Sequence, residues 1–300
     1  MLPIVAYTDK LTVAAGESIS VMVGAFGARQ YVADLRRIIQ GDTNPEGPGY
    51  RDEPIALDLG GVRNAVAKGF HPGSCVIIPG QGMLADLSAF TLAAAIYPTL
   101  LDGRERCVIA LPGFARIGIE PSGRIFGEAF GVRLEAEIPA RVNTWQVVTF
   151  AASEAGDLVL SMECDSTSSG GSMKASVVRG KAVLAACAAD EVLIAANRGA
   201  DGQPVAFFDG KIDRPALFAT ALPHATVRAL LMDFEPQSRH PGLRAAWDFS
   251  RRMTTEVIYD VSPFQLHGRI HNAPARAMTG WQWRGQEKKK KKRPDLYSAI

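Results

Sequence analysis

Several familiar signatures of function are absent from this sequence of 300 residues. It has no G-x-S-x-G turn, which holds the nucleophilic serine of many hydrolases, and no glycine-rich loop with the spacing that binds a nucleotide. No apolar run approaches the roughly 18 uninterrupted residues that span a bilayer as a helix. These absences argue against a serine hydrolase of that type, a nucleotide-binding enzyme and a helical membrane protein.

Cysteine is also scarce, with four residues in the whole chain. They form no C-x-x-C pair and no cluster with histidine, which a zinc site would need. Their neighbours are mostly apolar, so we expect Cys75, Cys107, Cys164 and Cys187 to be buried, reduced thiols. Disulfides and a metal site are the alternatives.

The chain has little net charge. Its formal charge is +2 at pH 7, and the run of basic residues at 288–293 supplies much of the basic excess. The remainder is slightly acidic, so it lacks the basic surface that nucleic acid requires. Residues 1–10 lack the basic and apolar segments of a signal peptide. We therefore expect a cytoplasmic protein that binds neither nucleic acid nor a membrane.

Short strands separated by turns dominate the middle of the chain. Their apolar patterns predict strands at 74–78, 90–97, 107–111, 117–120, 124–130, 145–151, 158–164, 193–197 and 205–208. Many closely spaced strands with few helical segments are typical of an antiparallel sandwich. Only residues 224–232 have the pattern of a short helix, and residues 181–189 fit either a helix or a strand.

The flanking regions are also predicted to be β-rich. Residues 12–23 have the pattern of strand, glycine-centred turn and strand, and residues 31–39 fit a strand or a helix. Strands are expected again at 243–249 and 267–274. We therefore divide the chain into an amino-terminal β section (1–70), a sandwich (71–235), closing strands packed on it (236–285) and a charged linker (286–300).

The most informative stretch is residues 207–218. Glycine after Asp209 supplies the positive φ that a tight turn needs, and the strand that follows directs Ile212, Leu217 and Phe218 toward a core. Residues 208–213 resemble the F-x-G-x-I-D signature of laminin-G-like sandwiches. Residues 90–99 resemble their F-T-x-x-A-W-x-x-P strand, with Ala95 in the tryptophan position, and residues 145–150 resemble their W-x-x-V strand. The resemblance implies a concanavalin A/laminin-G-like jelly roll.

The flanks resemble a narrower family. Residues 3–9 (PIVAYTD), 14–17 (AAGE), 246–250 (AWDFS) and 272–280 (NAPARAMTG) are similar to the amino-terminal part of the large (beta) subunit of N,N-dimethylformamidase. Residues 294–300 resemble the approach to the catalytic domain of that family. The HFHDDD-like segment with which that domain begins does not occur in this sequence.

This resemblance implies a function without an active site in the chain. In that family a mononuclear iron, held by tyrosines and a glutamate of the carboxy-terminal domain, hydrolyses small N-substituted formamides. None of those ligands can be assigned to a residue here. The resemblance therefore implies a non-catalytic structural or assembly domain with no cofactor of its own. Its expected partners are a catalytic domain or subunit and a small subunit, in an oligomeric enzyme.

Two other functions remain open. A stand-alone lectin-like module that binds carbohydrate or protein would show an aromatic-lined groove on the central sheet. An independent hydrolase would need a catalytic constellation, and the sequence suggests none. The assembly hypothesis instead predicts an exposed apolar interface around Trp281, Trp283 and Tyr297.

Few individual residues are candidates for chemistry. His267 and His271 have the i, i+4 spacing of metal ligands on a helix, but a strand is expected there, which would place them roughly 13 Å apart. Asp209 and Asp213 flank a turn without the cluster of oxygen ligands that calcium needs. Ser74 begins a predicted strand and is a poor candidate nucleophile. We predict structural roles for all of them.

Overall fold

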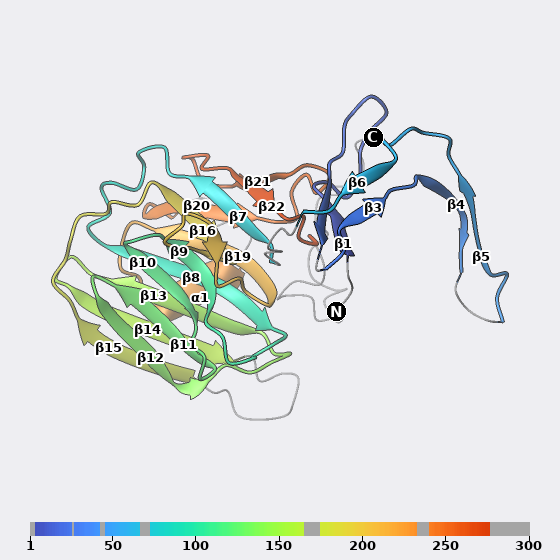
Figure 1. The fold of residues 1–300 in the computed structure, drawn as a ribbon. Coiled ribbons are helices and arrows are strands. Elements are labelled where there is room, and N and C mark those ends of the chain that lie inside the picture. Colours follow the sequence, from blue (N-terminus) through green and yellow to red (C-terminus); the bar gives the residue numbers. More distant parts are fainter. Residues whose placement is uncertain are drawn as a thin grey trace, which may run out of the picture. The chain divides into compact units, whose positions relative to one another are not determined.

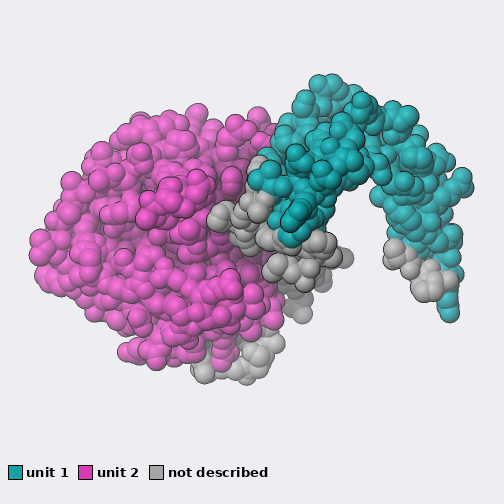
Figure 2. All heavy atoms as spheres, viewed as in Figure 1, with its two compact units in different colours: residues 1–72 teal, residues 73–300 magenta. Residues whose placement is uncertain are grey.

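The computed structural model describes residues 4–25, 27–42, 46–66, 73–164, 175–232 and 240–276. The chain forms two compact units, which we call unit 1 (Met1–Pro72) and unit 2 (Gly73–Ile300) (Figure 2). Within the described residues, no helix has the length and apolar character needed to cross a membrane.

The described residues of unit 1 form three antiparallel ribbons of two strands each. The pairs are β1 (Ile4–Thr8) with β2 (Val21–Ala25), β3 (Gln30–Val32) with β6 (Val62–Asn64), and β4 (Arg36–Gly41) with β5 (Tyr50–Pro54). The β4–β5 hairpin continues from the β3–β6 ribbon, since the amide of Ile55 donates to the carbonyl of Leu35 between them (Figure 1).

The part of unit 2 that the structure describes is built on one antiparallel sheet of 14 strands and one helix, α1 (His224–Met232). In spatial order the strands are β12 (Val132–Pro139), β11 (Arg124–Ala129), β10 (Ala115–Ile119), β9 (Arg106–Leu111), β16 (Glu191–Ile194), β7 (Cys75–Pro79), β22 (Gly268–His271), β21 (Val257–Asp260), β20 (Leu243–Asp248), β19 (Gly210–Phe218), β8 (Phe90–Pro98), β13 (Gln146–Ala152), β14 (Asp157–Cys164) and β15 (Ala175–Lys181). A small hairpin of β17 (Asn197–Arg198) and β18 (Pro204–Val205) is added to it.

The long sheet curls until its two end strands meet. The amide of Glu137 in β12 donates to Ser176 Oγ in β15 over 3.0 Å. Phe150 of β13 lies against Gly127 of β11, where an added Cβ would collide with the phenyl ring. The sheet therefore forms two facing layers, and the prediction of a mainly β, antiparallel sandwich with an added amino-terminal β section is confirmed (Figure 1).

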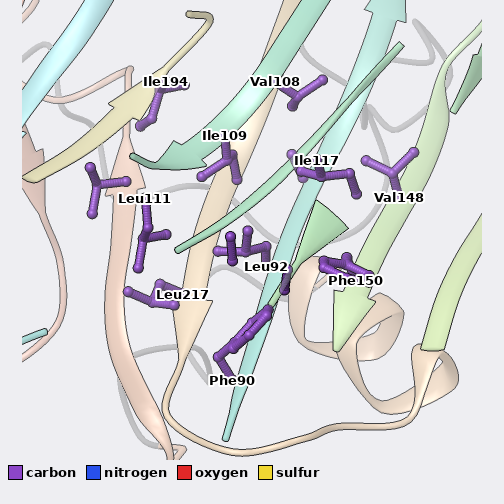
Figure 3. Close-up of a cluster of buried hydrophobic side chains, with 14 of the residues drawn as sticks. Phe90, Leu92, Val108, Ile109, Leu111, Ile117, Val148, Phe150, Ile194 and Leu217 are labelled. Atoms are coloured by element: carbon purple, nitrogen blue, oxygen red, sulfur yellow. The ribbon is translucent and has the colours of Figure 1, made fainter. Parts of the chain in front are cut away.

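Large apolar side chains from both layers fill the space between them. Figure 3 shows part of this core, which includes Phe90, Leu92, Ile109, Leu111, Ile117, Val148, Phe150, Ile194 and Leu217. The alternation of β8 explains which of its residues point inward, because successive side chains of a strand face opposite sides of the sheet. Phe90, Leu92 and Ile96 join the core, whereas Ala93 and Ala95 face the other side.

Helix α1 covers that other side of β8 and β13. Val227 and Leu231 of the helix pack on Ala93, Ala95 and Val147 of the strands. A helix can approach so closely only because the strand residues beneath it are small. This packing accounts for a small residue, alanine, at position 95.

The carboxy-terminal strands of unit 2 are organised around a buried carboxylate. Asp260 accepts hydrogen bonds from the amides of Ala246, Ser262 and Leu266 and from the Ser262 hydroxyl, over 2.6–2.9 Å. The indole of Trp247, which is buried in the core, donates to the carbonyl of Leu266 over 2.8 Å. These contacts place β20–β22 inside the main sheet, between β7 and β19.

Several predicted elements differ from the structure. Residues 12–20 are not a strand, and pairing begins only at Val21. The strand predicted at 193–197 breaks at Ala195, which has a φ of 68°. The strand predicted at 205–208 ends at Val205, because Ala206 has a φ of 53°. Residues 181–189 fitted a helix or a strand; Lys181 ends β15, and residues 182–189 form neither. Residues 31–39 contain strands rather than a helix.

Among the strands of the described residues, the sequence analysis missed six: β1, β5, β6, β12, β15 and β21. In β12, apolar Val132, Leu134 and Ala136 alternate with charged Arg133 and Glu135, which is the pattern of a strand with one solvent-facing side. The turn at Asp209 was predicted correctly. Gly210 has a φ of 146° and begins β19, and the side chains of Leu217 and Phe218 are buried.

Candidate functional site

Unit 1 carries most of the exposed apolar residues. Among the described residues of unit 1, Ala25 is the only hydrophobic residue that is buried. Fifteen large hydrophobic side chains of this unit are exposed, against eight in the described part of unit 2. Two-stranded ribbons are marginally stable alone and normally need a third strand or a packed face. In its described residues, unit 1 therefore lacks the core that its strands require.

Five of these fifteen exposed side chains follow the β3–β6 ribbon and its continuation. Val32 and Val62 are directly opposite each other and are 62% and 63% exposed. Leu35 and Ile55 come next along the ribbon, joined by a backbone hydrogen bond, and Leu57 lies beyond them. We call Val32, Leu35, Ile55, Leu57 and Val62 the apolar ribbon surface. It is the strongest candidate for an interaction surface in the described residues.

The β4–β5 hairpin is held by a polar clamp instead of a core. Arg36 donates from Nε and Nη2 to the two carboxylate oxygens of Asp52 over 2.7 and 2.9 Å. The Tyr50 hydroxyl donates to the same carboxylate over 3.2 Å. The hydrogen bond from Arg36 holds the pKa of Asp52 below its ordinary value. The clamp therefore stays ionised and keeps the two strands in register at neutral pH.

An arginine–glutamate network covers one outer face of the sandwich. Arg116 and Arg133 pair with Glu105 and Glu128 at distances of 2.5–3.1 Å, and Arg133 also contacts Glu120. Both guanidinium groups lie over the ring of Phe126, at 5.1 and 4.2 Å from its centroid. Phe126 is fully buried beneath them. The network seals an outward-facing aromatic ring from water.

This network should make unit 2 sensitive to acid. Burial alone would raise the pKa of Glu128, but the hydrogen bonds and charges of Arg116 and Arg133 outweigh it and hold the pKa below its ordinary 4.5. A carboxyl group whose pKa is lower in the folded state than in the unfolded state stabilises the fold at pH values above its unfolded pKa. This stabilisation is lost as the pH falls through the pKa of the folded state.

We expect the denaturant midpoint of unit 2 to fall as the pH is lowered from about 5 to about 3. Glu128→Gln should make this decline less steep and should lower stability at pH 7. Urea titrations of both proteins across this range measure the effect. Parallel pH profiles for the two proteins would contradict the assigned role of Glu128.

A second polar cluster lies where α1 meets the sheet. Thr149 Oγ1 lies 2.9 Å from His224 Nδ1. On the other side of the imidazole ring, Nε2 lies 3.5 Å from one carboxylate oxygen of Glu163. The other oxygen of Glu163 lies 2.7 Å from Arg228 Nε. Burial lowers the pKa of His224, although Glu163 opposes this shift. The order of hydroxyl, imidazole and carboxylate resembles a catalytic triad. However, Thr149 is buried on the sheet and is closed to a substrate.

The structure does not bring the candidate histidines together with other ligands. His267 accepts a hydrogen bond at Nδ1 from the amide of Asp260, and His271 lies in β22 opposite Cys75. Among the described residues, no group of three or more histidine, cysteine, aspartate or glutamate side chains could hold a metal ion.

The remaining candidates make local structural contacts. Asp209 accepts a hydrogen bond from the Thr99 hydroxyl over 3.4 Å and lies 3.9 Å from Arg106. Ser74 donates from its hydroxyl to the carbonyl of Asn272 over 2.8 Å. Asp213 lies in β19 opposite Ala95.

The four cysteines are buried thiols, as predicted. Burial raises the pKa of Cys75 to about 11 and that of Cys107 to about 12, so neither thiol is a nucleophile at neutral pH. Trp281, Trp283 and Tyr297, the predicted interface residues, lie outside the described residues.

Comparison with known proteins identifies the relatives. The chain is 29% identical to the N,N-dimethylformamidase beta subunit of Paracoccus aminophilus, in an alignment that covers 98% of this chain and 42% of that protein. The corresponding subunit of an Alcaligenes species is 28% identical with the same coverage. This chain is a relative of the N,N-dimethylformamidase beta subunits. The resemblance seen in the flanking motifs is thus confirmed.

The N,N-dimethylformamidase beta subunits are much longer, and the chain spans 42% of their length. No family model matches the sequence. Among solved structures, a putative carbohydrate-binding protein from Bacteroides ovatus aligns with 74% of this chain and 65% of its own, at 13% identity and a TM-score of 0.49. A pentraxin from Limulus polyphemus aligns with 53% of this chain and 82% of its own, at 12% identity and a TM-score of 0.37.

Proposed function

We propose that this chain is a non-catalytic assembly part of an N,N-dimethylformamidase-like amidohydrolase. Its relatives are named as beta subunits of a hydrolase, and the chain corresponds to only part of their length. In this proposal the hydrolysis of small N-substituted formamides, and the iron that performs it, belong to the rest of the enzyme. A small partner subunit completes the assembly.

The apolar ribbon surface is the observation that carries this proposal. Burying a valine, leucine or isoleucine side chain contributes roughly 1.5–3 kcal/mol. A partner that covers the five residues of this surface therefore supplies the core that unit 1 lacks. The partner we propose is the polypeptide that corresponds to the part of the N,N-dimethylformamidase beta subunit that this chain does not cover.

Two further features support a structural role. The four buried cysteine thiols suit the cytoplasmic location expected from the sequence. The concanavalin A/laminin-G-like assignment also belongs to this proposal, and the closing turn at Gly210 and the inward-facing Phe90, Leu92 and Ile96 support it.

Binding to the rest of the enzyme tests the proposal directly. The tagged full chain, expressed in its source cells, should capture a polypeptide similar to the remaining part of the N,N-dimethylformamidase beta subunit. The captured complex should hydrolyse N,N-dimethylformamide, and the purified chain alone should not. Val32→Asp combined with Val62→Asp should reduce capture at least tenfold, because it would bury two unpaired charges.

A matched control separates this surface from general effects of charge. Val177→Asp changes a valine of β15 in unit 2 that is 51% exposed, and it should leave capture unchanged. Hydrolysis by the chain alone would overturn the proposal. Equal capture by wild type and by the Val32/Val62 variant would show that the apolar ribbon surface is not the contact.

The lectin-like alternative lacks a supporting observation. It needs an open aromatic-lined groove on the central sheet. In the described residues, the inner side of β8 and β13 is filled by the core, and α1 packs on their outer side. A glycan array with the full chain would detect such binding, and a specific signal would favour the alternative.

A further inference from the structure

The outer edge of β5 has a self-complementary charge pattern. Arg51 and Glu53 lie two residues apart on one face of the strand, with Nη2 of the arginine 3.8 Å from Oε1 of the glutamate. Their side chains are 71% and 56% exposed. Asp52, which lies between them, points to the opposite face of the hairpin, where Arg36 clamps it.

Only one side of β5 is paired. Its partner among the described residues is β4, in a sheet of two strands. The backbone groups on the other side have no neighbouring strand, and such an edge is a template for another strand. The edge of β4 is less suitable, because the pairing of that strand is irregular between Ile38 and Gln40.

Antiparallel pairing of β5 with β5 of a second copy brings opposite charges together. With Asp52 at the centre, Arg51 lies opposite Glu53 of the second copy, and the symmetry of the pair produces the same contact twice. Tyr50 then lies opposite Pro54. The two Asp52 carboxylates face each other, but each is already neutralised by the Arg36 of its own chain.

We propose that two copies of this chain associate through their β5 edges into a four-stranded sheet in the order β4–β5–β5–β4. Charged residues on an edge strand normally prevent pairing with other strands. In β5, however, the order of Arg51 and Glu53 places opposite charges together when the edge pairs with the same edge of a second copy. The proposal uses the strand edge and not the apolar ribbon surface, so it stands or falls independently of the proposed function.

Charge reversal tests this pairing in the full chain. Analytical ultracentrifugation of wild type should show a reversible dimer. Arg51→Glu and Glu53→Arg should each weaken the dimer roughly tenfold, because each places like charges opposite one another twice. The double variant, Arg51→Glu with Glu53→Arg, restores opposite charges and should recover the wild-type dissociation constant. It should not form mixed dimers with wild type.

Two further measurements distinguish this register from a general effect of surface charge. Arg269→Glu reverses an arginine of unit 2 with similar exposure, 75%, and should leave the dimer unchanged. An equal mixture of Arg51→Cys and Glu53→Cys chains should form a disulfide-linked dimer on mild oxidation. Glu53→Cys alone should form far less, because equivalent positions are diagonal neighbours, roughly 7–8 Å apart, in this register. A monomeric wild type would overturn the proposal. The proposal would also be overturned if the single charge reversals left the dimer unchanged, or if the double variant dimerised as weakly as the single variants.

Discussion

Replacing Phe90 by alanine is expected to lower the free energy of unfolding of unit 2 by about 3–5 kcal/mol. Phe90 comes from β8, and its ring centroid lies 5.5 Å from that of Phe114, 5.8 Å from that of Phe150 and 6.3 Å from that of Phe130. Phe150 belongs to the same layer, whereas Phe114 and Phe130 belong to the turns of the facing layer. Alanine would leave a cavity at the point where the two layers are joined.

Hydrogen exchange of β8 and β13 as a function of urea measures this loss for unit 2 alone. Phe90→Leu provides a control, because it fills most of the cavity and should lose less than half as much stability. A loss below about 1 kcal/mol for the alanine variant would mean that the site can collapse around the smaller side chain.

Replacing Asp260 by alanine is expected to cost roughly 3–5 kcal/mol, because it leaves several buried donors without an acceptor. The carboxylate holds the amides of Ala246, Ser262 and Leu266 in place. The loop to which Trp247 donates its indole hydrogen bond depends on the same contacts. The variant should therefore release β21 and β22 from the sheet before the rest of unit 2 unfolds.

Hydrogen exchange of β20–β22 and the fluorescence of Trp247 report this local opening. Asp157→Ala removes an exposed carboxylate that pairs with Lys181, and it should cost less than about 1 kcal/mol. Similar stability of Asp260→Ala and Asp157→Ala would show that the hydrogen bonds of Asp260 do not hold β20–β22 in the sheet.

These two variants also help to separate loss of binding from loss of folding. Both act on unit 2, whereas the capture and self-association tests change residues of unit 1. Loss of capture with an unchanged unit 2 therefore identifies the apolar ribbon surface as the contact. Loss of both would indicate general misfolding.

Local sequence patterns predicted much of unit 2 because its strands alternate regularly. The pattern of residues 90–97 identified β8, and that of residues 224–232 identified α1, whose bounds agree with the structure. Prediction failed where the backbone turns without glycine or proline. Ala195 and Ala206 have positive φ values, which an alanine adopts only when surrounding contacts hold it, and no local pattern reveals that.

The candidate surface was harder to predict than the fold. The pattern of residues 12–23 predicted a strand that includes Val21, but it did not reveal that Val21 is exposed. A strand with alternating apolar residues looks the same whether or not a second layer covers it. The pairing of Arg36 with Asp52, 16 residues apart, likewise depends on a hairpin register that the sequence alone does not reveal.

The sequence by itself determined the β-rich character of the chain, the burial of its cysteines and its kinship with the formamidase subunits, because each depends on local pattern or on residue identity. Tertiary structure decided the rest. It showed that α1 covers β8, that an ionic network covers Phe126, and that unit 1 has almost no core. These properties depend on which distant segments meet, and that is set by the packing of the whole chain.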